Sequence, residues 1–108
     1  MRNSSEQRAL RHYRLRLYRI LGTNVWIGGY EIDLVVRRGR TLVFVEVKSK
    51  GGDRYGDPLE MVTSEKQRRL RCAAETWLTS HPEAAELEAR FDVVGFREGR
   101  LEVVRQAF

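Results

Sequence analysis

The segment from residue 30 to residue 50, YEIDLVVRRGRTLVFVEVKSK, constrains the fold most strongly. Its two apolar runs, residues 31–36 and 42–48, are rich in β-branched and aromatic side chains, and a short turn-like sequence with one glycine separates them. This pattern predicts a β-hairpin. Because both faces of each run are apolar, we expect central strands that other elements cover on both sides.

Three ionisable residues, Asp33, Glu46 and Lys48, lie inside this apolar hairpin. Because side chains alternate along a strand, Asp33 is expected on the face opposite Ile32 and Leu34. By the same alternation, Glu46 and Lys48 are expected to share a face of the second strand. A buried carboxylate is costly unless it is paired or binds a metal ion, so both acids need partners.

Two carboxylates and one ammonium on paired strands favour a metal site. Asp33 and Glu46 would repel each other, and a divalent cation relieves such repulsion. Hard oxygen ligands with open water positions favour Mg²⁺ or Mn²⁺, and Lys48 would then orient or deprotonate the water that hydrolyses a phosphodiester. The alternative is an ion pair between Glu46 and Lys48 on an edge strand, with Asp33 hydrating a turn. The apolar surroundings favour the site.

Length and composition exclude several classes of protein. A chain of 108 residues is expected to form a single domain, residues 1–108. No apolar run approaches the ~20 residues of a membrane span, and the N-terminus lacks the apolar core of a signal peptide. We therefore expect a cytoplasmic protein without a membrane partner. The single cysteine, Cys72, excludes an internal disulfide. The sequence shows no Ser-His-Asp arrangement, so we do not expect nucleophilic catalysis.

The charge distribution favours a nucleic-acid partner. The formal net charge is +5, but residues 1–50 carry eleven Lys and Arg against four Asp and Glu, whereas residues 51–108 carry nine against eleven. The basic half therefore contains the expected site. Arginine greatly outnumbers lysine, and the guanidinium fork matches a phosphate. A basic face that is merely solvated is the alternative.

An amphipathic segment precedes the hairpin. Ser4 or Ser5 is expected to cap a helix that runs to about residue 16. Glu6 falls on the apolar stripe of this helix and is therefore expected to point toward the sheet, as a third acid near Asp33 and Glu46. The alternative is a first-turn glutamate that the helix dipole favours.

A second amphipathic segment follows a glycine-rich stretch, residues 51–58, which is either an ordinary connector or a substrate-contacting lid. Ser64 and Gln67 have the spacing of a capping box, and a helix is expected to end near residue 80. Lys66 lies in line with the apolar stripe and is expected over the sheet near Glu46. Lys66 and Gln67 are expected to meet a phosphate.

The order of elements predicts an α/β fold. Residues 18–27 read as a strand before the hairpin, and residues 90–96 and 101–105 read as two strands after the second helix. Strands followed by a helix that crosses to another strand imply a mixed central sheet flanked by helices.

These features together resemble the PD-(D/E)xK nuclease superfamily and, more closely, its YraN family of small bacterial proteins. The matching segments run nearly end to end: YRIL at 18–21, EIDL at 31–34, LVFVEVK at 42–48, GDP at 56–58, KQRRL at 66–70 and RFDVV at 90–94. The chain departs from the family pattern at three positions where glycine is usual, Ser5, Leu17 and Tyr30. Tyr30 is expected to alter the turn or narrow access to the metal.

The resemblance implies a restriction-endonuclease-like αβββαβ core and a metal-dependent endonuclease that uses Mg²⁺ or Mn²⁺. Its substrate would be DNA, including branched or structured DNA as in archaeal Holliday-junction resolvases. The resemblance also implies a homodimer, as junction-cleaving relatives form. It implies roles for a set of residues: Asp33, Glu46 and the Val47 carbonyl as metal ligands, Lys48 as the water-activating lysine, Glu6 as the auxiliary acid, and Lys50, Lys66, Gln67 and Arg69 as nucleic-acid contacts. A non-catalytic nucleic-acid-binding module is the alternative, and a scaffold subunit is a third.

Overall fold

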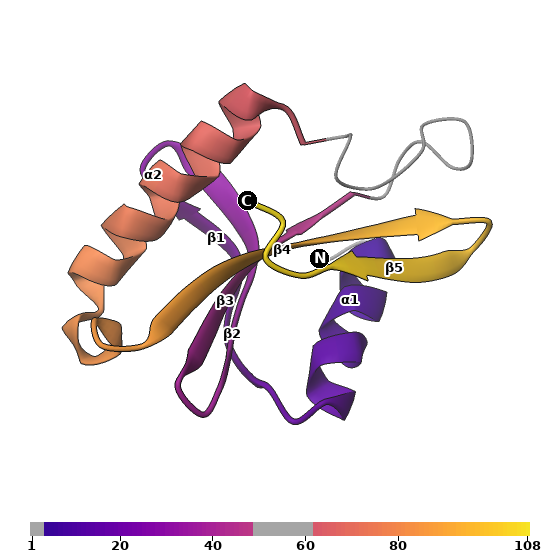
Figure 1. Cartoon of the computed structure of the whole chain (residues 1–108), viewed down its shortest axis with the longest axis horizontal. Helices are drawn as coiled ribbons and strands as arrows, with labels where there is room; N and C mark the ends of the chain where they lie inside the picture. The colour runs from indigo at the N-terminus through magenta and orange to yellow at the C-terminus, as the bar shows by residue number, and fades with distance from the viewer. Residues whose placement is uncertain (1–3, 49–61) are drawn as a thin grey trace.

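The computed structural model describes residues 4–48 and 62–108 of the chain. Along the chain, the elements are α1 (Ser4–Leu15), β1 (Arg19–Ile27), β2 (Tyr30–Arg38), β3 (Thr41–Val47), α2 (Ser64–Ser80), the 3₁₀ turn η3 (Pro82–Ala84), β4 (Glu88–Arg97) and β5 (Arg100–Val104). The predicted order of helix, three strands, helix and two strands is confirmed (Figure 1).

The described strands form one mixed sheet in the order β1-β2-β3-β4-β5. Neighbouring strands are antiparallel except β3 and β4, which are parallel and are connected through α2. A parallel pair needs such a crossover, because a hairpin turn joins only antiparallel strands. The sheet separates the two helices, with α1 on one face and α2 on the other (Figure 1).

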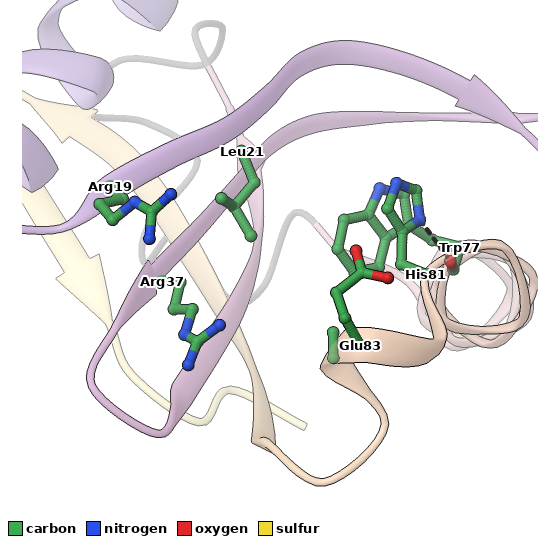
Figure 2. A pocket seen from close by; sticks show the side chains of 7 residues that line it. Arg19, Leu21, Arg37, Trp77, His81 and Glu83 are labelled. Carbon is green, nitrogen blue, oxygen red and sulfur yellow. Dashed lines mark hydrogen bonds between the residues drawn. The ribbon is translucent and has the colours of Figure 1, made fainter.

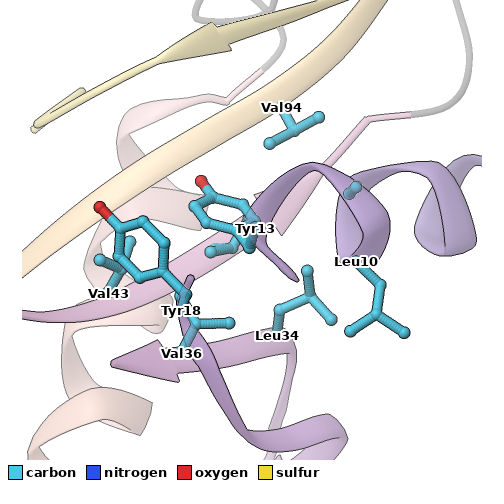
Figure 3. Packing of buried hydrophobic residues seen from close by; sticks show 9 residues of the cluster. Leu10, Tyr13, Tyr18, Leu34, Val36, Val43 and Val94 are labelled. Carbon is cyan, nitrogen blue, oxygen red and sulfur yellow. The ribbon is translucent and has the colours of Figure 1, made fainter. Parts of the chain in front are cut away.

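Each face of the sheet buries its own apolar cluster, and this explains why the central strands are apolar on both sides. On the α1 face, Leu10, Tyr13 and Tyr18 pack against β2, β3 and β4 (Figure 3). On the α2 face, the helix residues Leu70 and Trp77 pack against the same central strands. The prediction of central strands covered on both sides is therefore confirmed.

The alternation predicted for the first hairpin strand is wrong at Ile32. Ile32 belongs to the α2 cluster, whereas Leu34, two residues on, belongs to the α1 cluster. The register pairs of β2 with β3 run from Arg38 to Leu34. Beyond Leu34, the Asp33 carboxylate instead accepts a hydrogen bond from the backbone N–H of β3. Strict alternation therefore ends at the place where the regular pairing of β2 with β3 ends.

The turn after α1 explains one of the three departures from the family pattern. Leu17 has φ 68° and is 81% exposed. Its N–H donates to the Arg14 carbonyl at 3.0 Å, and the Tyr18 N–H donates to the Tyr13 carbonyl at 3.0 Å. These two bonds define a Schellman cap, in which the left-handed residue is usually glycine. Leucine is strained at this position because of its Cβ.

Leu17→Gly is therefore expected to raise the free energy of unfolding by about 1 kcal/mol, since glycine relieves the left-handed strain but costs chain entropy. Leu15→Gly is the matched control, because Leu15 is also exposed but lies in the last turn of α1. That variant is expected to lose about 1 kcal/mol, the usual cost of glycine in a helix. Urea unfolding of both variants measures the difference. Equal losses in the two variants would contradict the strain at Leu17.

Candidate active site

Asp33 lies in β2 and is buried, with 8% of its surface exposed. Its Oδ2 accepts a hydrogen bond from the backbone N–H of Val47 in β3 at 2.7 Å. This bond ties the carboxylate to the neighbouring strand. It also holds Asp33 close to Glu46, the residue before Val47 in the chain.

Glu46 lies in β3 and is 6% exposed. Its Oε2 is 3.0 Å from Lys48 Nζ and accepts a 3.4 Å hydrogen bond from the Tyr30 hydroxyl. The ion pair agrees with the prediction that Glu46 and Lys48 share a face. β3 lies between β2 and β4, so the alternative of an ion pair on an edge strand is wrong.

Asp33 and Glu46 line the same hollow of about 290 Å³. The hollow is also lined by Trp26 and Tyr30 from the first two strands and by Arg69 from α2. The structure therefore brings the two predicted carboxylates together, although 13 positions of sequence separate them. Within this hollow the two acids share one small, partly enclosed volume.

The shared volume changes the acidity of Asp33. Burial and then the negative charge of Glu46 raise the pKa of Asp33 to about 7, while the hydrogen bond from Val47 opposes the shift. The charges of Glu6 and Glu31 raise it further. A carboxyl with this pKa is partly protonated at neutral pH. A cation in the hollow would favour its ionised form.

The donor atoms fit a hard divalent cation. No hydrogen bond from the described part of the chain reaches Oδ1 of Asp33 or Oε1 of Glu46. With respect to the described residues, each acid thus has one oxygen without a hydrogen bond, and carboxylate oxygens are the ligands that Mg²⁺ and Mn²⁺ prefer. Among residues 4–48 and 62–108, no three His, Cys, Asp or Glu side chains form a group that would hold an ion. Within these two ranges, further ligands would come from backbone oxygens or water.

A third buried acid, Asp92, differs from Asp33 and Glu46 because hydrogen bonds engage both of its oxygens. It is fully buried in β4, and its Oδ1 accepts from Arg90 Nε at 2.9 Å and from the Gln106 N–H at 3.2 Å. Its Oδ2 accepts from the Tyr13 hydroxyl at 2.8 Å and from Arg90 Nη2 at 3.1 Å. Both oxygens are fully engaged, so Asp92 joins α1, β4 and the C-terminal segment and has no oxygen left for a ligand.

Glu6 lies in α1, which packs on the other face of the sheet from α2. Its Oε1 accepts a 3.2 Å hydrogen bond from Asn24 in β1. Its charge still contributes to the raised pKa of Asp33. Glu6 is thus near Asp33 without lining the hollow, and its role as an auxiliary acid stays a prediction, as does that of the Val47 carbonyl.

Lys66 lies beside Lys48, as the apolar stripe of α2 predicted. Burial by itself lowers the pKa of Lys48, but its hydrogen bond with Lys66 and the charge of Glu46 raise it above the ordinary value. The pKa of Lys66 is lowered by the hydrogen bond with Lys48 and by repulsion from its charge. Lys48 is therefore held as an ammonium, with a second amine next to it.

The other predicted nucleic-acid contacts differ in placement. Arg69 lines the hollow, and its Nε is 3.0 Å from Glu65 Oε2 in an exposed ion pair. Gln67 donates its side-chain amide to the Val62 carbonyl at 3.2 Å, so it is engaged at the start of α2. Lys50 and the predicted lid at 51–58 lie outside the described residues.

The capping residue of α2 is Thr63, one residue before the predicted Ser64. Thr63 has an extended backbone, and its Oγ1 accepts from the Lys66 N–H at 3.2 Å. The extended conformation suits an N-cap, whereas Ser64 is already helical. The predicted capping box of Ser64 with Gln67 is therefore wrong.

Tyr30, which was predicted from the sequence to alter the turn or narrow access to the metal, contacts the site directly. The positive φ angles of the β1–β2 turn belong to Gly28 and Gly29 (62° and 77°), so Tyr30 itself needs no glycine-like conformation and the turn tolerates it. Its ring lines the hollow. Burial and the charges of Glu46 and Asp33 raise the pKa of its phenol. Tyr30 thus occupies part of the space beside the carboxylates.

A second hollow, of about 210 Å³, lies near the C-terminal end of α2. Arg19 and Arg37 line it from β1 and β2, opposite Trp77, His81 and Glu83 (Figure 2). The His81 ring stacks on Trp77 with centroids 3.8 Å apart. This second hollow contains one carboxylate, that of Glu83, rather than a pair, so it lacks the arrangement expected for phosphodiester chemistry.

No helix in the described part of the chain is long and apolar enough to cross a membrane.

The fold and the site together define a class of protein. It is an α/β protein with helices on both faces of a mixed sheet, whose central strands carry a buried acidic pair and a lysine. The family model described as "Uncharacterised protein family UPF0102" matches residues 5–96. The chain belongs to this family, which is the YraN family predicted from its sequence.

Relatives in the same family match most of the chain. A UPF0102 protein of Alkalilimnicola ehrlichii is 41% identical over 106 residues, which is 98% of this chain and 84% of the relative. One from Geobacter metallireducens is 42% identical over 92 residues, covering 85% and 75%. One from Methylocella silvestris is 42% identical over 90 residues, covering 83% and 71%. These names state no activity, so the function must be argued from the site.

Proposed function

We propose that the protein is a metal-dependent endonuclease that hydrolyses phosphodiester bonds in DNA. The observation that supports this most is the pair of buried carboxylates, Asp33 and Glu46, which line one hollow with Lys48 3.0 Å from Glu46. Buried like charges are costly without a counter-charge. Two buried acids, each with one oxygen that receives no hydrogen bond from the described residues, suit a site that binds a cation.

Asp33 and Glu46 would hold Mg²⁺ or Mn²⁺, with the Val47 carbonyl as a further ligand and Glu6 as an auxiliary acid. A bound divalent ion supplies positive charge to the phosphate oxygens and makes water more acidic. The Val47 N–H orients Asp33 through Oδ2, and Lys48 orients Glu46 through Oε2. These contacts leave the remaining oxygen of each acid for the ion.

Lys48 would orient the attacking water rather than take its proton. The 3.0 Å ion pair with Glu46 favours the ammonium form of Lys48, which donates hydrogen bonds and accepts none. Lys66, adjacent to it, and Arg69, at the hollow, would contact phosphates on either side of the scissile bond. The basic first half of the chain would add sequence-independent attraction to the DNA.

A second candidate function is a nucleic-acid-binding module without catalysis. The contact that favours it is the Tyr30 hydroxyl on Glu46 Oε2, which already receives Lys48. This oxygen is satisfied without a metal ion. Such a module would bind DNA in a salt-dependent manner and would need no divalent cation.

The deciding experiment is a cleavage assay of the purified protein on linear duplex, single-stranded, flap and four-way DNA, each with Mg²⁺, Mn²⁺ or chelator. The endonuclease is expected to form products with either ion and none with chelator. Salt-sensitive binding without products on any substrate would favour the non-catalytic module. No binding even at low salt would contradict both and favour a scaffold subunit. Sedimentation of the same sample tests the proposed homodimer.

A further inference from the structure

We propose that Trp26 is a stacking site for an unpaired nucleobase beside the carboxylates. The substrate would then be nucleic acid with unpaired nucleotides next to the scissile bond. The part of this inference that concerns cleavage rests on the proposed function, but the binding of the base does not.

Trp26 is 72% exposed, whereas the other tryptophan, Trp77, is 4% exposed in the α2 cluster. Tryptophan carries the largest apolar surface of any side chain, and folding usually buries most of it. A single exposed apolar residue is common on protein surfaces, so exposure alone identifies no site. The location of Trp26 provides the second observation.

Trp26 lines the same hollow as Asp33 and Glu46. It lies in β1, at one edge of the described sheet, and is paired in register with Glu31 of β2. The tight turn at Gly28 and Gly29 joins the two strands and sets this register. The indole is therefore presented by a strand rather than by a loop, and the register of β1 with β2 sets its backbone position relative to Asp33.

The charges around the hollow suit the backbone of the same ligand. Arg69 lines the hollow, and the amines of Lys48 and Lys66 meet next to Glu46. Proteins that bind single strands combine cations that follow the phosphates with aromatic rings that stack on the bases. Here Trp26 and Arg69 line one hollow, and Lys48 pairs with Glu46 at its wall. In an intact duplex each base is already stacked on its neighbours, so only unpaired nucleotides offer a face to Trp26.

Two measurements in chelator test the site without cleavage. The first is the tryptophan fluorescence of the wild-type protein during titration with a single-stranded thymidine oligonucleotide. Quenching is expected, because Trp26 is exposed and would stack on thymine while Trp77 is buried. The second is the affinity of a dye-labelled oligonucleotide, followed by its anisotropy. Trp26→Ala is expected to weaken single-strand binding about tenfold, the usual order of one base stack. Duplex binding should be unchanged.

Trp26→Phe is expected to retain most of the affinity, since it keeps an aromatic face. Leu17→Ala is the matched control, because Leu17 is an equally exposed apolar residue in the turn after α1. Circular dichroism verifies that each variant is folded. Unchanged affinity of Trp26→Ala, or equal weakening by Leu17→Ala, would overturn the proposal. So would a change from dimer to monomer in Trp26→Ala without a change in affinity, since Trp26 would then contact a second copy.

The outcomes separate this inference from the proposed function. Quenching and weaker binding by Trp26→Ala, without cleavage in Mg²⁺, would support the stacking site and contradict the nuclease. Cleavage of single strands and duplex at equal rates, unaffected by Trp26→Ala, would support the nuclease and overturn the stacking site.

Discussion

Glu46→Gln is expected to reduce Mg²⁺-dependent cleavage by about a hundredfold to a thousandfold, the order of effect found when one electrostatic group of an active site is removed. Glutamine has nearly the same shape, and its amide oxygen still accepts a hydrogen bond from Tyr30. It has no charge, so it holds a divalent cation poorly and no longer forms an ion pair with Lys48. The single-turnover rate on the substrate that wild-type protein cleaves best is the appropriate measurement.

Glu75→Gln is the matched control, because it removes the same charge from an exposed position on α2. Its cleavage rate should equal that of the wild-type protein. If Glu46→Gln, shown by circular dichroism to be folded, cleaves as fast as Glu75→Gln, the hollow is not the catalytic site. The basic surface would then have to act without these carboxylates.

Asp33→Asn is expected to stabilise the metal-free protein above neutral pH by a few kcal/mol, at roughly 1.4 kcal/mol per pKa unit. The pKa of Asp33 is raised from 3.8 in the unfolded chain to about 7 in the fold by burial and by Glu46. The folded state therefore binds this proton more tightly, and wild-type stability falls as the pH rises from about 4 to about 7. Asparagine has no charge to bury, and its amide oxygen can still accept from Val47.

Urea unfolding of both proteins in chelator, across this pH range, measures the effect. The two free energies of unfolding should converge near the acid end and diverge as the pH passes through the pKa of Asp33. Added Mg²⁺ should restore part of the wild-type stability at high pH and leave Asp33→Asn unchanged, because binding to the folded state alone stabilises it. A stability difference that does not vary with pH would contradict the raised pKa.

Local rules predicted the elements well because they act over few residues. The hairpin of β2 and β3 follows from two apolar runs and a glycine turn, and the order of helices and strands follows from the period of the apolar residues. The same rules failed at single residues. The cap of α2 is Thr63 rather than Ser64, because the choice between adjacent hydroxyl residues depends on where the backbone becomes extended. Ile32 lies off the predicted face, next to the point where the regular pairing of β2 with β3 ends and the Asp33 carboxylate accepts the Val47 N–H.

The sequence by itself determined that Glu46 and Lys48 would share a face, since residues two apart on a strand do so, and in the structure they form a 3.0 Å ion pair. Only the tertiary structure decided that Asp33 would bind the N–H of Val47 and that Trp26 would line the hollow. The physical reason is that strand alternation is a property of one strand. Contacts between strands and with α2 depend on register, turn geometry and packing across the whole sheet.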